Sequence, residues 1–147
     1  MGREVRRVPP DWRHPKNEET GRYKPLCDGK QYPELAAEFM EKANTEGLQE
    51  AIDYFGGAPD QSDYMPLWSE DEATHYMMYE DTSEGTPISP AFETPEALAR
   101  WLADTGASAF GDSTATYEGW LRVAQGGYAP SAVYTPQAGL VSGVEAL

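Results

Sequence analysis

The chain has 147 residues, a formal net charge of −14 and 39% hydrophobic residues, including four Trp, nine Tyr and four Phe. This aromatic content argues against a disordered chain, in which high net charge accompanies few aromatic residues, and it favours one folded domain with a substantial core. The charge argues against direct binding of nucleic acid or an anionic membrane, because phosphate groups are bound by clustered Lys and Arg.

The basic residues are concentrated at the N-terminus. Residues 1–30 contain eight basic and five acidic residues, whereas the remaining residues contain three basic and 20 acidic ones. We therefore predict an extended, basic, Pro-rich arm over 1–31 and an acidic α+β domain over 32–147. Residues that precede proline avoid the helical region, so the arm is expected to lie extended on the domain. Val8 and Trp12 are its predicted apolar anchors.

Two helices are expected next. Pro33 suits a first helical turn, and the apolar spacing that follows predicts a helix over 33–43. Apolar residues at 48, 51, 52 and 55 predict a second helix over 48–55, which Gly56 and Gly57 end. The acidic segment 58–72 contains two prolines and is typical of a loop.

The residues at 74–79 (THYMMY) lack helix and strand breakers and predict a strand. Because both of its faces are partly apolar, it is expected to be a central strand. Residues 80–90 form a predicted loop. Long loops on rigid frames often carry function, although the Ser and Thr residues here are equally suited to satisfying the loop's own backbone.

The last third of the chain predicts two helices and a hairpin. Thr94-Pro95-Glu96 is a typical helix start, and Gly106 ends that helix. Thr114 or Thr116 caps the next helix, which runs to 126–127, and the tail at 131–144 has the pattern of a hairpin with strands at 132–134 and 140–141. The expected fold is α+β, with a small antiparallel or mixed sheet of three to four strands packed with about four short helices.

Catalytic and metal-binding motifs are missing from the sequence. The two histidines, His14 and His75, and the single cysteine, Cys27, have no metal-ligand spacing. No Gly-x-Ser-x-Gly motif or calcium-binding loop is present. We predict no cofactor, and an enzyme that uses His75 with Asp or Glu remains an alternative. No stretch reaches the ~18–20 apolar residues that a membrane span needs.

The acidic residues are therefore the candidate partner-binding groups. Together they could present a field that proteins specific for nucleic acid mistake for a phosphate backbone. The predicted contact residues are Glu46, Glu50, Asp53, Asp60, Asp63, Glu70, Asp71, Glu72, Asp81 and Glu84.

Several segments also resemble a known group of proteins. MGREVRRVPPDWRHP at the start, THYMMYEDTSEGTPISPAFETPEALARWLADTGASAFG at 74–111, GYAPSAV at 127–133 and SGVEAL at 142–147 are similar to small uncharacterised acidic proteins encoded by bacteriophages and prophages. The resemblance implies a phage or prophage protein in the bacterial host cytoplasm. It implies no activity, cofactor or catalytic residue.

The sequence thus favours a small phage-encoded interaction protein. Its expected partner is a protein with a basic surface, and inhibition of a host nucleic-acid-handling or defence protein is one such role. The alternative is a virion or assembly component whose N-terminal arm contacts neighbouring subunits.

Overall fold

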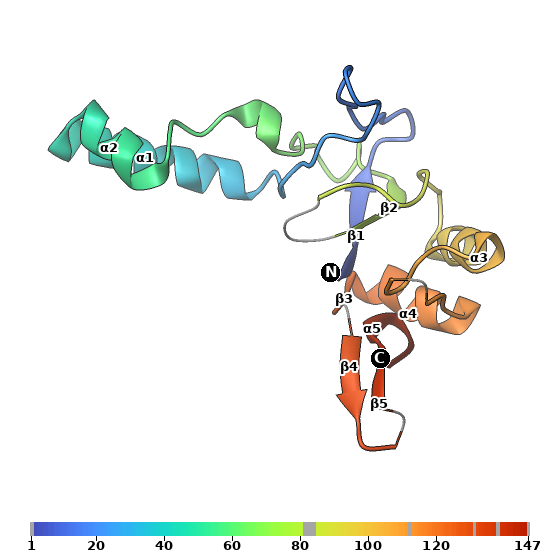
Figure 1. Ribbon diagram of the computed structural model, residues 1–147. Helices are drawn as coiled ribbons and strands as arrows, with labels where there is room; N and C mark the ends of the chain where they lie inside the picture. The colour runs from blue at the N-terminus through green and yellow to red at the C-terminus, as the bar shows by residue number, and fades with distance from the viewer. Residues whose placement is uncertain (1, 81–84, 112, 131, 138, 147) are drawn as a thin grey trace. The chain divides into compact units, whose positions relative to one another are not determined.

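The computed structural model describes residues 2–80, 85–111, 113–130, 132–137 and 139–146. These residues form an α+β fold with a three-stranded antiparallel sheet (Figure 1). The chain divides into two compact units, one formed by Met1–Pro25 with Trp68–Leu147 and the other by Leu26–Leu67. None of the described helices is long and apolar enough to cross a membrane.

The sheet of the first unit is built around the N-terminal strand. β1 (Arg3–Val8) lies between β2 (His75–Glu80) and β3 (Tyr128–Ala129), with Val5 opposite Met78. The predicted separate arm is therefore not confirmed, since its first residues form the middle of the sheet. β2 was expected to be central, but it is an end strand of this sheet.

The contacts of the three arginines of β1 explain why so charged a segment can be a central strand. The Arg6 guanidinium lies 4.5 Å from the centre of the Tyr79 ring, and that of Arg7 lies 4.0 Å from the centre of the Tyr76 ring. Arg3 is buried and lies 3.7 Å from a carboxylate oxygen of Glu80. Each guanidinium thus has a ring or a carboxylate beside it, which offsets the cost of desolvating a charge.

The outer edge of β2 is also hydrogen-bonded. Tyr76 and Phe92 exchange two backbone hydrogen bonds of 2.7 and 2.8 Å, and the Ile88 amide donates to the Met78 carbonyl at 2.9 Å. Between these pairs, the Ser89 hydroxyl accepts the Met78 amide at 2.9 Å in place of a backbone carbonyl. The second half of the predicted 80–90 loop therefore covers an edge that would otherwise expose unpaired backbone groups.

Helices α3 (Pro95–Thr105) and α4 (Tyr117–Gly126) pack against each other and supply most of the core. Thr94 accepts the Ala97 amide at 3.1 Å and Thr116 accepts the Gly119 amide at 3.1 Å, so both helices have the predicted N-caps, with Thr116 as the second cap. The core residues Leu98, Leu102, Trp120, Val123, Ala124 and Met78 are buried between these helices and the sheet.

The tail forms the predicted hairpin but does not extend the main sheet. β4 (Ala132–Thr135) and β5 (Gly139–Ser142) pair antiparallel as a separate two-stranded sheet. A short helix, α5 (Gly143–Ala146), follows and packs on α4, where the Thr116 hydroxyl donates to the Glu145 carboxylate at 2.9 Å.

The Leu26–Leu67 unit is a helical hairpin with two flanking segments. α1 (Gln31–Glu46) is longer at both ends than the predicted 33–43, and α2 (Leu48–Phe55) matches its prediction. The helices meet at Phe39 and Phe55, whose ring centroids are 5.8 Å apart. A 3₁₀ turn, η1 (Gln61–Asp63), precedes the residues that pair with Cys27.

Candidate functional site

The predicted acidic residues do not form one described surface. Glu46, Glu50, Asp53, Asp60 and Asp63 belong to the Leu26–Leu67 unit, whereas Glu70, Asp71 and Glu72 belong to the other unit. All eight are exposed. Asp81 and Glu84 lie outside the described residues.

Several of these carboxylates have local structural roles. Glu72 accepts hydrogen bonds from the Ser69 amide at 3.3 Å and the Ser69 hydroxyl at 3.0 Å, as in a capping box. Asp60 accepts the Ser62 amide at 2.9 Å at the start of η1. These contacts order the acidic loop and leave the carboxylates exposed to solvent.

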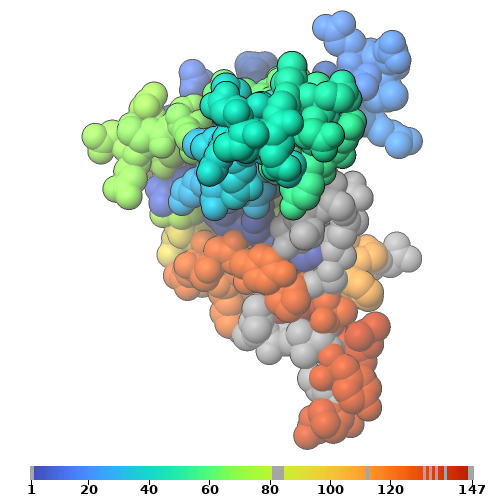
Figure 2. Space-filling model, turned by 90° about the vertical axis from the view of Figure 1, so that its left-hand side faces the viewer, coloured from blue at the N-terminus to red at the C-terminus, as the bar shows by residue number. Residues whose placement is uncertain are grey.

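One acidic feature of the described residues is a shallow groove between α1 and α2, with a volume of about 410 Å³. It is lined by Glu38, Glu41, Lys42, Thr45, Glu46, Tyr54 and Phe55. Figure 2 shows the surface of this helical hairpin in cyan and green. Of these residues, only Glu46 is among the predicted contact residues, although the i, i+3 spacing of Glu38 and Glu41 places both on one helix face.

Lys42 shows how this groove accommodates a cation. Its ammonium lies 2.7 Å from a Glu46 carboxylate oxygen and 4.4 Å from the centre of the Tyr54 ring. The hydrogen bond to Glu46 raises the pKa of Lys42. From the sequence, Glu38 is an equally spaced i, i+4 partner for Lys42, but the ion pair forms with Glu46, one turn further along α1.

Exposed apolar side chains accompany the acidic groups on this hairpin. Met40, Leu48 and Tyr54 are 56%, 60% and 72% exposed. The unit as a whole contains nine acidic and two basic residues, a net charge of −7. Of the three apolar side chains, Tyr54 lines the groove. Exposed apolar side chains on an element of one charge sign are a feature of protein-binding sites.

A second polar cluster lies on the face of the sheet that carries Tyr79. The Trp12 indole N–H donates to the Tyr79 hydroxyl at 3.1 Å, and that hydroxyl is 2.9 Å from His14 Nδ1. His14 Nε2 is 2.5 Å from the Lys24 carbonyl oxygen, which can only accept. The Nε2 atom of His14 therefore carries a proton, and in the neutral ring Nδ1 accepts the Tyr79 proton.

Burial keeps this cluster uncharged at neutral pH. It lowers the pKa of His14, with a smaller contribution of the same sign from Arg6, while the hydrogen bond to Lys24 opposes the shift. Burial also raises the pKa of Tyr79 to about 12. Val8 is fully buried and Trp12 lies 4.9 Å from Trp68, centroid to centroid, so both predicted anchors contact their own unit.

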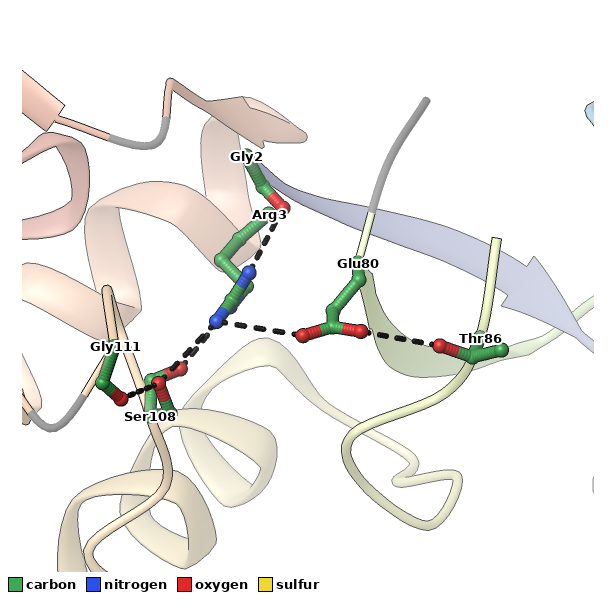
Figure 3. Close-up of polar contacts among 6 residues, drawn as sticks. All are labelled: Gly2, Arg3, Glu80, Thr86, Ser108 and Gly111. Atoms are coloured by element: carbon green, nitrogen blue, oxygen red, sulfur yellow. Dashed lines mark hydrogen bonds and ion pairs between the residues drawn. The ribbon is translucent and has the colours of Figure 1, made fainter. Parts of the chain in front are cut away.

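The third cluster surrounds Arg3 at the end of the sheet (Figure 3). Its Nε donates to the Ser108 carbonyl at 3.0 Å, and a terminal nitrogen donates to the Gly2 carbonyl at 3.1 Å. Glu80, which faces Arg3, also accepts the Thr86 hydroxyl at 3.1 Å. Arg3 thus joins β1, β2 and the connection between α3 and α4, which is a structural role.

The alternative of an enzyme that uses His75 with Asp or Glu gains no support from the position of His75. His75 Nδ1 lies 3.0 Å from the hydroxyl of its neighbour Thr74. Within the described residues, no group of three or more His, Cys, Asp or Glu side chains could hold a metal ion. No protein-family model, curated protein or solved structure matches the chain.

Proposed function

We propose that this protein is an interaction protein that binds a basic surface of a partner protein through the α1–α2 hairpin. The observation that carries the proposal is the position of Lys42 between the Glu46 carboxylate and the Tyr54 ring. The same groove has further carboxylates, at Glu38 and Glu41, that can pair with a Lys or Arg of the partner.

The surrounding charge supports fast and selective association. A unit with a net charge of −7 attracts a basic surface over a screening length of about 8–10 Å at ordinary ionic strength. The exposed Met40 and Leu48 would then provide apolar contact area, which individual exposed ion pairs of about 0–1 kcal/mol do not replace.

A basic surface that normally binds phosphate is the partner favoured by this chemistry. The proposal therefore includes inhibition of a host nucleic-acid-handling or defence protein in the bacterial cytoplasm. Its support is the acidic composition together with the resemblance to phage and prophage proteins described above.

A virion or assembly component that contacts neighbouring subunits through its N-terminal segment is the alternative. Arg3–Val8 form the middle strand of the sheet, and Trp12 packs on Trp68 within the same unit. Such contacts would therefore be made by exposed residues that follow β1, such as Arg13 and Lys16.

Affinity purification from a bacterial lysate tests the proposal. The wild-type protein should retain a basic partner at low ionic strength and release it at high ionic strength. Glu38→Gln with Glu41→Gln should weaken retention, whereas Glu93→Gln with Glu118→Gln, which neutralise two exposed carboxylates of the other unit, should not. Equal retention by both double variants, or a partner that is not basic, would contradict the proposal.

A further inference from the structure

A groove of opposite charge lies in the unit formed by Met1–Pro25 and Trp68–Leu147. It consists of two adjoining hollows with volumes of about 820 and 560 Å³. The two hollows adjoin at Lys16, Tyr23 and Pro87, and they are lined by the segment after β1 and the segment along the outer edge of β2.

The larger hollow has a mixed lining, in which apolar side chains lie beside polar and charged ones. Trp12, Tyr23, Ile88 and Trp101 line it together with prolines at 10, 87 and 90, and its polar and charged lining residues are Asp11, Arg13, His14, Lys16 and Ser89. Tyr23 is 42% exposed, so part of the apolar surface is accessible to a ligand. The apolar part of such a concave surface can bind a side chain of a ligand by removing it from water, and the polar groups beside it can fix its orientation.

The rim of the groove is basic. Arg13, Lys16, Arg22 and Lys24 line the two hollows, and Asp11 is the single acidic residue among the described lining residues. Among the described lining residues the formal charges sum to +3, whereas the net charge of the chain is −14. The charge of its ligand should be negative.

The packing of the aromatic rings indicates what kind of anion fits. Trp12 packs edge-on against Trp68 and His14, with interplanar angles of 74° and 83°. Lys16 lies 5.0 Å from the centre of the Tyr23 ring and occupies one of its faces. Nucleobases bind to ring faces on which they can stack, and Lys16 already covers one face of Tyr23.

The charge around the groove also favours an acidic peptide over a nucleic acid as the ligand. DNA carries one charge per about 1.7 Å of its axis, so a nucleic acid would extend beyond the groove over the rest of the same unit, whose residues outside the groove have a net charge of −10. A peptide with a few carboxylates confines its charge to the groove.

We propose that this groove binds an acidic peptide segment of a partner protein. A proline, aliphatic or aromatic residue of the peptide occupies the hollow between Trp12, Ile88 and Trp101, and the flanking carboxylates pair with Arg13, Lys16 and Arg22. This inference is independent of the function proposed for the α1–α2 hairpin, which lies in the other unit and binds a basic partner.

Peptide selection on the intact protein tests the inference. Displayed random peptides selected on the wild-type chain should be enriched in Asp and Glu around a Pro, aliphatic or aromatic residue. The affinity of an enriched peptide, measured by Trp fluorescence, should fall about two- to thirtyfold in Arg13→Gln with Lys16→Gln, as expected for two exposed charge contacts.

The matched control is Arg100→Gln with Arg122→Gln, which makes the same change in net charge at two exposed residues that do not line the groove. It should bind the peptide as tightly as wild type, and equal weakening in both double variants would overturn the inference. Enrichment of basic peptides, or tighter binding of oligothymidylate than of the peptide, would do the same. Concentration-dependent dimerisation that the Arg13 and Lys16 substitutions abolish would show instead that the groove binds a second copy of the chain.

Discussion

Acidification should destabilise the first unit through the buried imidazole of His14. In the folded protein, its Nε2–H bonds the Lys24 carbonyl and its Nδ1 faces the Tyr79 hydroxyl, so the neutral ring suits its surroundings. Burial lowers the pKa of His14, and the nearby Arg6 guanidinium also disfavours a second positive charge. His14→Gln removes the titrating group and can retain both a donor and an acceptor.

The sign and size of the effect follow from proton linkage. An unfolded histidine has a pKa of about 6.5, whereas that of folded His14 is lower, so the unfolded chain binds more protons between the two values. Well above pH 6.5, His14 therefore makes no pH-dependent contribution to the free energy of unfolding. As the pH falls through about 6.5, His14 lowers this free energy. The decrease levels off below the folded-state pKa of His14. Between about pH 7.5 and pH 5.5, His14 can lower the free energy of unfolding by at most about 1.4 kcal/mol. Solvent screening at the adjoining groove keeps the contribution of His14 below this limit.

Urea unfolding at a series of pH values measures this contribution. The wild-type free energy of unfolding should fall more steeply over that interval than the free energy of His14→Gln, and the carboxylates common to both proteins cancel in the difference. His75→Gln, which deletes the other imidazole and leaves the Tyr79 cluster intact, is the matched control for the loss of a histidine. Identical slopes for wild type and His14→Gln would show that His14 does not contribute to the pH dependence of stability.

Three further predictions concern the stability of the fold and can be checked by urea unfolding. Gly29→Ala should cost about 1–3 kcal/mol, because the added Cβ would lie 2.2 Å from the Met65 carbonyl oxygen, whereas Gly126→Ala, with open space around it, should be tolerated. Arg3→Met should cost about 1–3 kcal/mol, because it leaves the Gly2 and Ser108 carbonyls, which are buried or partly buried, without the Arg3 donor, and an unchanged midpoint would exclude this role. Thr94→Ala should cost about 0.5–2 kcal/mol through the loss of the α3 N-cap, and Thr94→Ser should restore most of it.

The candidate sites depend on contacts that local sequence patterns do not reveal. The acidic residues could be named from composition, but their division between two units could not. The groove beside His14 combines residues from 10–23, 87–91 and Trp101, which are distant in the sequence. Its basic charge was visible as an N-terminal cluster, and only the fold shows that apolar residues from later segments lie beside it.

Local sequence patterns are sufficient to predict the helices and turns that are stabilised by contacts between residues close in the chain. The Thr94 cap and the spacing of Leu98 and Leu102 predict α3, and the spacing of Ala51 and Phe55 predicts α2, because helix hydrogen bonds and caps join residues that are close in the chain. The two glycines after α2 and the turn of the C-terminal hairpin are likewise local signals.

The pairing of the strands in the main sheet is evident from the tertiary structure and not from local sequence patterns. Arg3–Val8 have no alternating pattern of apolar residues, and their partners His75–Glu80 lie far along the chain. A charged segment becomes a central strand here because Arg3, Arg6 and Arg7 find a carboxylate or aromatic rings that distant residues supply. Pairing between distant segments depends on such contacts, which local propensity does not encode.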